Sequence, residues 1–455
     1  MFSLSKSTYI KGDQCIKALY LEKNRSFLRD KISARQLAVF SRGTNVGILA
    51  RDCYPGGLDM SPKSPKMFGK MITETIRNIN NPNVNVLYEA VFKNDDTLIM
   101  LDIIVRDGDK WKAIEVKSST ALSTTYYKDA ALQYYVLNGC GIQLSDFQLM
   151  YINSEYTRHD DIDLTQLFKC QSVLNDIKTY QEEIRNNIQK FKTALGTSHS
   201  PAIPIGVQCH KPYICDFRGH CWKNVPKDSY LFMTAMNEEI LFEEYNNGIC
   251  TNEDFIRHNS LDNIQLKQIE ALNNNTYYIN KVSFLKMSGN TTGKIAYLSM
   301  MDYNKTIPEN EGEHPYQPTF DAFCILYEED EKTVYHFWEK TEENNKEAYK
   351  ILADSIKDFD KVVLFTHNAD VFHQISNENL PEIIDLHAVL IKADFFHKKI
   401  RLHFTLKNVY EGIKPGNSIN EHESMILNNN DKPFIKECLR KEAEAIKEIF
   451  NEWQE

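Results

Sequence analysis

The stretch LDIIVRDGDKWKAIEVKSST, residues 101–120, holds two apolar segments on either side of a turn. LDIIV and KAIEV have the β-branched composition of strands, and the Asp-Gly step between them favours a β-hairpin. Each segment nevertheless carries one carboxylate, Asp102 or Glu115, where a core strand usually holds an apolar side chain. A carboxylate in such a place must lose its charge or find a partner. The hairpin therefore predicts a functional centre.

Asp102 and Glu115 can be neighbours across this hairpin, and a divalent cation would satisfy both. Magnesium takes oxygen ligands and suits one or two carboxylates together with a substrate phosphate. Residues two apart on a strand face the same side, so Lys117 points the same way as Glu115. Glu89, on the preceding predicted strand, and the backbone carbonyl of Val116 are further candidate metal ligands. The pattern predicts metal-assisted hydrolysis. The alternative is a structural ion pair, because such short patterns are common.

The segments around the hairpin predict a mixed α/β core. Helical periodicity over residues 1–50 and 64–79 leads into three strands, and a helix and another strand follow. A polar helical region and a second α/β pattern complete the chain. We expect three domains, at residues 1–227, 228–288 and 289–455.

The pieces LDII, IEVKSS and ALQYYVL resemble the RecB-type nucleases of the PD-(D/E)XK superfamily. The resemblance implies that Asp102 and Glu115 bind Mg²⁺ or Mn²⁺ and that Lys117 is the catalytic lysine. Gln133 matches the glutamine that these nucleases place on the next helix. The companion tyrosine is replaced by Leu137, with Tyr134 or Tyr135 as substitutes, and the stretch RGTNVGILA lacks the histidine that many members have there.

Four of the ten cysteines form a second pattern. Cys209, Cys215 and Cys221 are separated by five residues each within CHKPYICDFRGHCW, and Cys15 lies near the N-terminus. This layout resembles the iron–sulfur nucleases of the RecB group, such as the CRISPR-adaptation exonucleases and the AddB nuclease domain. It implies a 4Fe–4S cluster that staples the two ends of the nuclease domain. Zinc is the alternative, since four cysteines, or three with one histidine, also suit it. The neighbouring histidines are His210 and His220.

The whole layout resembles a bacterial family of unknown function in which an iron–sulfur nuclease is joined to an RNase H-like exonuclease domain. The matching pieces include RDCYPGG, IPENEGEHPYQP and the stretch 385–415. Exonucleases of that fold use four acids to hold two metal ions. Here Asp302 is present, but Asn304 replaces the glutamate that should follow it.

The other acid positions of that domain are also altered. Asn368 is kept, but Val371 and Phe372 stand where an aromatic–acid step is expected, and Asp370 is displaced. Near the C-terminus, Lys441 and Glu442 stand where the family has an aspartate. Asp385 is expected to cap a helix. We therefore expect a degenerate exonuclease domain that serves binding of DNA or of a protein partner.

Composition limits the function classes. The net charge of −10 counts mildly against extensive phosphate contact. No apolar run approaches the roughly 20 residues that span a bilayer, and the first residues lack the pattern of a signal peptide, so we expect a cytoplasmic protein without membrane contact. The leading hypothesis is an Mg²⁺- or Mn²⁺-dependent deoxyribonuclease, an exonuclease on single-stranded DNA in repair or in defence against foreign DNA. The alternative is a catalytically inactive nucleic-acid-binding or scaffold protein.

Overall fold

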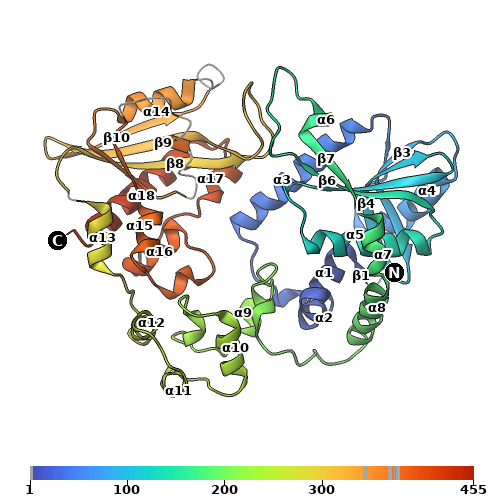
Figure 1. Cartoon of the computed structure of the whole chain (residues 1–455), viewed down its shortest axis with the longest axis horizontal. Coiled ribbons are helices and arrows are strands. Elements are labelled where there is room, and N and C mark those ends of the chain that lie inside the picture. Colours follow the sequence, from blue (N-terminus) through green and yellow to red (C-terminus); the bar gives the residue numbers. More distant parts are fainter. Residues whose placement is uncertain are drawn as a thin grey trace.

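The computed structural model describes residues 4–289, 291–341, 347–366, 371–372, 375 and 380–454. It contains two mixed β-sheets, each covered by helices, and a helical segment that connects the two parts (Figure 1). The α/β prediction is confirmed. The division at residues 227 and 288 stays a prediction. No helix in the described part of the chain is both long enough and apolar enough to cross a membrane.

The first sheet is built around the quoted hairpin. Its strands follow the order β2-β3-β4-β5-β6-β7, and β1 pairs in parallel with the beginning of β4. The strands are β1 Leu4–Ser5, β2 Leu58–Asp59, β3 Val86–Asn94, β4 Thr97–Asp107, β5 Lys110–Lys117, β6 Leu144–Ile152 and β7 Phe168–Ser172. Strands β3, β4 and β5 form the expected antiparallel meander, and β6 returns parallel to β5 after a helix.

Helices cover both faces of this sheet. Helices α1, α5 and α8 bury one face in a core that includes Phe92, Phe147 and Phe191, and α3 packs on the other face through Val46 and Ala50. The helices of this region are α1 Lys6–Gln14, α2 Ile16–Asn24, α3 Ala34–Ala50, α4 Phe68–Ile79, α5 Thr124–Gly139, α6 Leu164–Leu167, α7 Leu174–Thr179 and α8 Gln181–Leu195.

The start of α1 is fixed locally. The Ser5 side chain accepts a hydrogen bond from the backbone of Thr8, and the Thr8 side chain accepts one from the backbone of Ser5. This reciprocal capping satisfies two otherwise unpaired N–H groups. Because β1 ends at Ser5, the cap places Lys6 in the first turn of α1, directly beside the sheet.

The connecting segment is helical and has its own small core. Tyr230 stacks on Phe255 with ring centroids 3.9 Å apart, and Leu272 packs in the same cluster. Its helices are α9 Arg218–Cys221, α10 Glu238–Asn246, α11 Asn252–His258, α12 Asn263–Asn273 and α13 Lys281–Ser288.

The second sheet has the order β10-β9-β8-β11-β12. The central strand β8 is antiparallel to β9 and parallel to β11. Helix α14 covers one face, while α15, α16 and α18 cover the other (Figure 1). The elements are β8 Ile295–Lys305, β9 Gln317–Glu329, β10 Lys332–Glu339, α14 Ala348–Ile356, β11 Lys361–Leu364, β12 Glu382–Asp385, α15 Leu386–Lys392, α16 Leu406–Ile413, α17 Glu423–Leu427 and α18 Lys432–Asn451.

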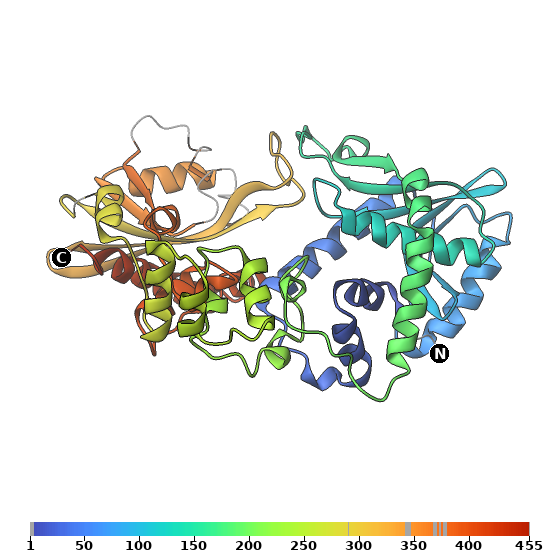
Figure 2. The ribbon, with the colours of Figure 1, turned by 60° about the horizontal axis from the view of Figure 1, so that its bottom comes forward.

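The connection between β8 and β9, residues 306–316, reaches the first sheet (Figures 1 and 2). We call it the strap. The Gly312 N–H donates to the carbonyl of Arg158, whose own N–H donates to the carbonyl of Glu313, at 2.8 and 3.0 Å. At the end of the strap, the Tyr316 hydroxyl donates to the carbonyl of Ser118. The strap therefore touches the chain at Ser118, directly after Lys117.

Candidate active site

The hairpin brings Asp102 and Glu115 together, as expected. The antiparallel pairing of Ile103 with Ile114 places the two acids at the next facing position of β4 and β5. The Val116 N–H donates to Asp102 Oδ2 at 2.7 Å and fixes that carboxyl group at the end of the pairing. A role for the Val116 carbonyl as a metal ligand stays a prediction.

Glu115 is the most deeply buried acid of this site, with 1% of its surface exposed. Its Oε1 accepts hydrogen bonds from Lys6 at 2.6 Å and from Lys117 at 2.8 Å. Burial alone would raise the pKa of this carboxyl, but the two ammonium groups outweigh burial and hold the pKa well below its usual range. Its Oε2 is buried and makes no hydrogen bond in the described structure. An ionised carboxylate with one unpartnered oxygen is suited to coordinate a cation.

Asp102 is in the opposite electrostatic state. Burial, together with the negative charge of Glu115, raises the pKa of Asp102 to about 8, and Lys6 opposes this rise only in part. Asp102 is therefore mostly protonated at neutral pH. Two adjacent acids with pKa values pushed apart in this way are typical of functional sites.

Asp129 belongs to this site and was missed from the sequence. It lies on α5, is buried, and accepts a hydrogen bond from Lys117 at 2.5 Å. Burial disfavours the charge of Lys117, but Asp129 and Glu115 outweigh burial and raise the pKa of the lysine. Gln133, one turn later on α5, donates to Asp129 at 3.4 Å, and its own Oε1 is buried without a partner. Gln133 thus supports Asp129 and does not contact the hairpin acids through a hydrogen bond in the described structure. The spacing of four residues from Gln133 on a predicted helix was the one signal for Asp129.

Lys6 was also missed as a site residue. Besides its bond to Glu115, its ammonium lies 3.8 Å from Asp129, so two lysines and two acids alternate around one point. Lys6 is 109 positions before Glu115 in the chain and begins α1 directly after β1. No local pattern in the sequence signals such a contact.

Glu89 lies at the edge of the site. By the register of β3 and β4 it faces Asp102, but it adopts a left-handed backbone conformation with φ of 50°. Such a conformation costs about 1 kcal/mol for a residue with a side chain. Its carboxylate accepts a hydrogen bond from Arg51 at 3.0 Å. Burial raises the pKa of Glu89, partly against Arg51, and Glu115 raises it further. Glu89 thus interacts electrostatically with Glu115, and its carboxylate is already paired with Arg51.

Tyr134 and Tyr135 make no hydrogen bond to Asp102, Glu115 or Lys117 in the part of the chain that the structure describes. The hydroxyl of Tyr135 donates to Asp95 at the far end of β3 and β4. Leu137, at the position where the resemblance expects a tyrosine, is fully buried in the core. A substitute for that tyrosine stays a prediction.

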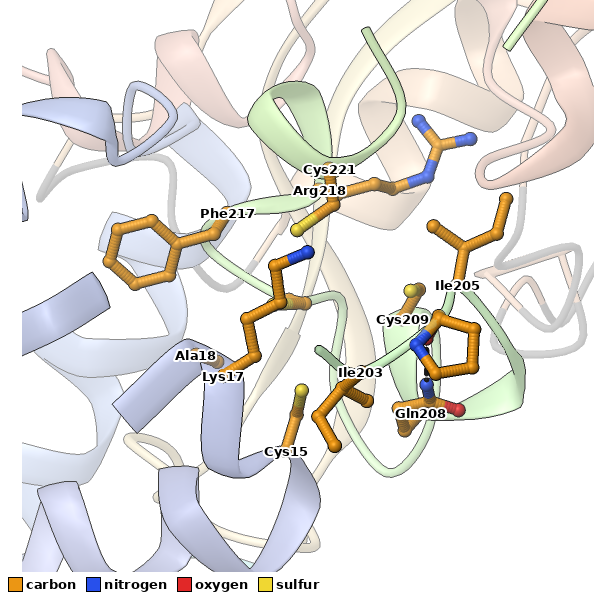
Figure 3. A pocket seen from close by; sticks show the side chains of 12 residues that line it. Cys15, Lys17, Ala18, Ile203, Ile205, Gln208, Cys209, Phe217, Arg218 and Cys221 are labelled. Atoms are coloured by element: carbon orange, nitrogen blue, oxygen red, sulfur yellow. Dashed lines mark hydrogen bonds between the residues drawn. The ribbon is translucent and has the colours of Figure 1, made fainter. Parts of the chain in front are cut away.

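The four predicted cysteines line one small cavity (Figure 3). The cavity lies between the start of α2, which follows Cys15, and the stretch that carries Cys209, Cys215 and Cys221. Burial raises the pKa of Cys215 to about 12, and the other three thiols add to the rise. The Cys215 thiol is therefore neutral at neutral pH, and a cation bound among the cysteines would favour its ionised form.

Hydrogen bonds also join these two segments. The Gln14 side chain donates to the carbonyls of Gln208 and Tyr213 at 2.8 and 2.6 Å, and Lys11 pairs with Asp216 at 2.6 Å. The two ends of the first domain are therefore tied together by the polypeptide itself.

The side chains that line the cavity suit a cysteine-bound metal group, but the free volume is too small for one. Its free volume is about 10 Å³, close to that of one water, because the Lys17 side chain extends among the thiols (Figure 3). Among the residues that the structure describes, no three His, Cys, Asp or Glu side chains are arranged to hold a metal ion. His210 is engaged on both ring nitrogens, with Glu238 at 3.1 Å and Arg218 at 3.2 Å. The cysteines are thus the better ligand set.

The second sheet carries the remaining predicted positions. Asp302 lies at an irregularity of β8, and the Asn304 Oδ1 atom is buried without a hydrogen bond in the described structure. Val371 and Phe372 pack in the core beneath α14. Asn368 and Asp370 lie outside the described residues.

Two further positions of this domain are now placed. Asp385 accepts a hydrogen bond from the His387 N–H at 3.0 Å and caps α15, so the predicted capping role is confirmed. Lys441 points outward to Glu437, whereas Glu442 is buried and turned toward β8.

A scan against protein-family models finds no match, and a search of curated proteins finds none.

Proposed function

We propose that this chain is an Mg²⁺- or Mn²⁺-dependent nuclease that hydrolyses phosphodiester bonds of DNA. The observation that carries the proposal is the unpartnered, buried Oε2 of Glu115 near the protonated Asp102, with the Lys117 ammonium held beside Glu115. An ion bound there would polarise the phosphodiester and lower the pKa of its water.

Each residue of the site has a defined role in this proposal. Glu115 offers the free carboxylate oxygen, and Asp102 gives up its proton when an ion arrives. Lys117 is held by Asp129, so its charge stays near the scissile phosphate and stabilises the negative charge that develops during hydrolysis. Gln133 orients Asp129 and so acts through it.

The fold supports the same proposal. A meander followed by a helix and a parallel strand, with the acids on β4 and β5, suits a nuclease domain of the PD-(D/E)XK type. The strand order of the second sheet, with β8 in the centre, suits an RNase H-like domain. The shared cysteine cavity suits a 4Fe–4S cluster or, as the alternative, Zn²⁺, held by Cys15, Cys209, Cys215 and Cys221, with Lys17 moving out. We further propose single-stranded DNA as the substrate and exonucleolytic action.

One observation favours the competing function, a nucleic-acid-binding protein that does not cut. Lys6 and Lys117 already balance the charges of Glu115 and Asp129 without any ion. In that case Mn²⁺ would change neither DNA binding nor the integrity of the DNA.

Cleavage of end-labelled single-stranded DNA with Mn²⁺ or with EDTA separates the two functions. Lys117→Met keeps the stem of the side chain but removes its charge, and we expect cleavage to fall by about 10²- to 10⁴-fold. Lys112→Met is the matched control, because Lys112 lies on the same strand and pairs with Val105 away from the acids. If Lys117→Met cuts as fast as the control, the ion pair is structural and the proposal fails.

The cysteine-bound group has its own test. We expect the purified protein to absorb visible light through thiolate-to-iron charge transfer, which zinc does not provide. Cys209→Ser should remove that absorption and lower the melting temperature, whereas Cys250→Ser should not, because Cys250 is exposed and outside the cavity. A colourless protein that contains zinc would instead support the alternative.

A further inference from the structure

The second sheet contains a carboxylate pair that is bridged by a histidine. His422 precedes α17, and its Nε2 lies 2.9 Å from the backbone oxygen and 3.4 Å from Oδ1 of Asp302. Its Nδ1 lies 3.6 Å from Oε1 of Glu442, which comes from α18. Both ring nitrogens thus face oxygen atoms. A neutral imidazole has only one N–H, so carboxylates near both ring nitrogens favour the doubly protonated, positively charged form.

The electrostatics agree with this geometry. Burial alone would lower the pKa of His422, but Glu442 and Asp302 outweigh burial and raise the pKa to about 10. The other acid nearby, Asp385, is occupied with the cap of α15, and burial raises its pKa. Asp302 also has a neutral contact, because the Thr366 hydroxyl donates to its Oδ2 at 3.0 Å.

Every carboxylate oxygen of the pair therefore has a partner from the chain. Ser299 donates to Glu442 Oε2 at 2.7 Å, which completes the set. A divalent ion needs carboxylate oxygens that are not already engaged. The two-metal centre that the RNase H-like resemblance implies does not fit these residues.

We infer that His422 itself is the cation of this centre: it takes the place between Asp302 and Glu442 that a divalent ion would need, so the C-terminal domain binds no catalytic metal. This inference is independent of the nuclease site on β4 and β5. It also corrects the expectation that the centre is degenerate because acids are missing, since Glu442 does face Asp302.

The centre opens into a cavity between α3 and the C-terminal domain, so a ligand can reach it. The cavity has a volume of about 810 Å³ and is lined by Asp302, His422 and Glu442 together with polar side chains of α3. Two of its charged lining residues, Arg35 and Glu423, form an ion pair at 4.0 Å. Such a cavity can hold a ligand, but it lacks the metal chemistry for cleavage.

The test measures Mn²⁺ binding by isothermal titration in a protein that carries Asp102→Asn and Glu115→Gln. These changes remove the proposed nuclease site, so its success or failure does not enter the result. With His422 intact, we expect no Mn²⁺ binding at the C-terminal centre. With His422→Asn added, the carboxylates lose their internal cation, and we expect one Mn²⁺ to bind, at least about tenfold more tightly than any residual binding by the protein with His422 intact. His403→Asn is the matched control, because His403 lines the same cavity and His422, not His403, lies between the two carboxylates.

Two outcomes overturn the inference. One is Mn²⁺ binding by the protein with His422 intact that Asp302→Asn abolishes. The other is a folded His422→Asn protein that gains no Mn²⁺ binding. If His422→Asn does not fold, His422→Lys decides. A folded His422→Lys protein that binds no Mn²⁺ supports the inference, because lysine restores the positive charge. A His422→Lys protein that does not fold overturns the inference.

Discussion

The raised pKa of Asp102 predicts a steep pH dependence of metal binding. An ion can use the Asp102 carboxylate only after the proton has left, and the pKa of about 8 means that this proton is present at neutral pH. The apparent affinity for Mn²⁺ should therefore fall as the pH is lowered below about 8, and it should level off above that pH. A carboxyl with its ordinary pKa, near 4, would give no change in this range.

The size of the effect follows from the ionised fraction of Asp102. With a pKa of about 8, roughly one molecule in 100 is ionised at pH 6, about one in ten at pH 7 and half at pH 8. The apparent Kd for Mn²⁺ should thus decrease about 50-fold between pH 6 and pH 8. Binding at pH 7 should release about 0.9 proton per ion.

Isothermal titration of Mn²⁺ in buffers with different ionisation enthalpies measures both quantities. Asp102→Asn is the control: its Mn²⁺ binding should be weaker and should lose the dependence on pH in this range. An apparent Kd that stays constant from pH 6 to pH 8, or binding without proton release at pH 7, would show that Asp102 is not a ligand of the ion, and the site would have to be redrawn.

Three further predictions concern other contacts. Lys6→Met should tighten Mn²⁺ binding about tenfold, because its ammonium competes for Glu115 through a charge-assisted hydrogen bond worth roughly 1.5–3 kcal/mol; weaker binding in the titration would contradict this. Tyr316→Phe removes the hydrogen bond from the strap to Ser118, and it should slow cleavage severalfold while the Kd for Mn²⁺ stays constant, which kinetics with saturating Mn²⁺ can separate. Phe147→Ala opens a cavity in the fully buried core and should lower the free energy of unfolding by about 3–5 kcal/mol in urea titration, and a loss below 1 kcal/mol would contradict this.

The part of the first site that lies on the β4–β5 hairpin can be predicted from local sequence patterns. Alternation and the Asp-Gly turn determine the hairpin, and the hairpin determines that Asp102 and Glu115 are neighbours. The helix after β5 could also be predicted from its periodicity, which places Gln133 near the strands. The role of Lys6 could not be predicted, because Lys6 lies far from this segment in the sequence. Its contact with Glu115 depends on the pairing of β1 with β4.

The site around Asp302 in the second sheet could also be predicted only in part from the sequence. Counting acids against the family pattern places Asn304 and Lys441 at acid positions, and it also notes Glu442. The count could not show that Glu442 turns toward Asp302, nor that a histidine from an irregular segment lies between them. His422 has no helical or strand periodicity to place it, since it lies just before the short α17.

One physical feature distinguishes the two carboxylate centres of this chain: whether an oxygen is left without a partner. At the first centre, Lys6 and Lys117 share the same oxygen of Glu115, and the other oxygen remains buried and unpartnered in the described structure. At the second, His422 and two hydroxyl groups engage all four oxygens of Asp302 and Glu442. Desolvation makes an unpartnered carboxylate oxygen costly, so a centre that keeps one gains more from binding a cation than a centre that has none. For that reason we assign metal chemistry to the hairpin and ligand binding to the C-terminal cavity.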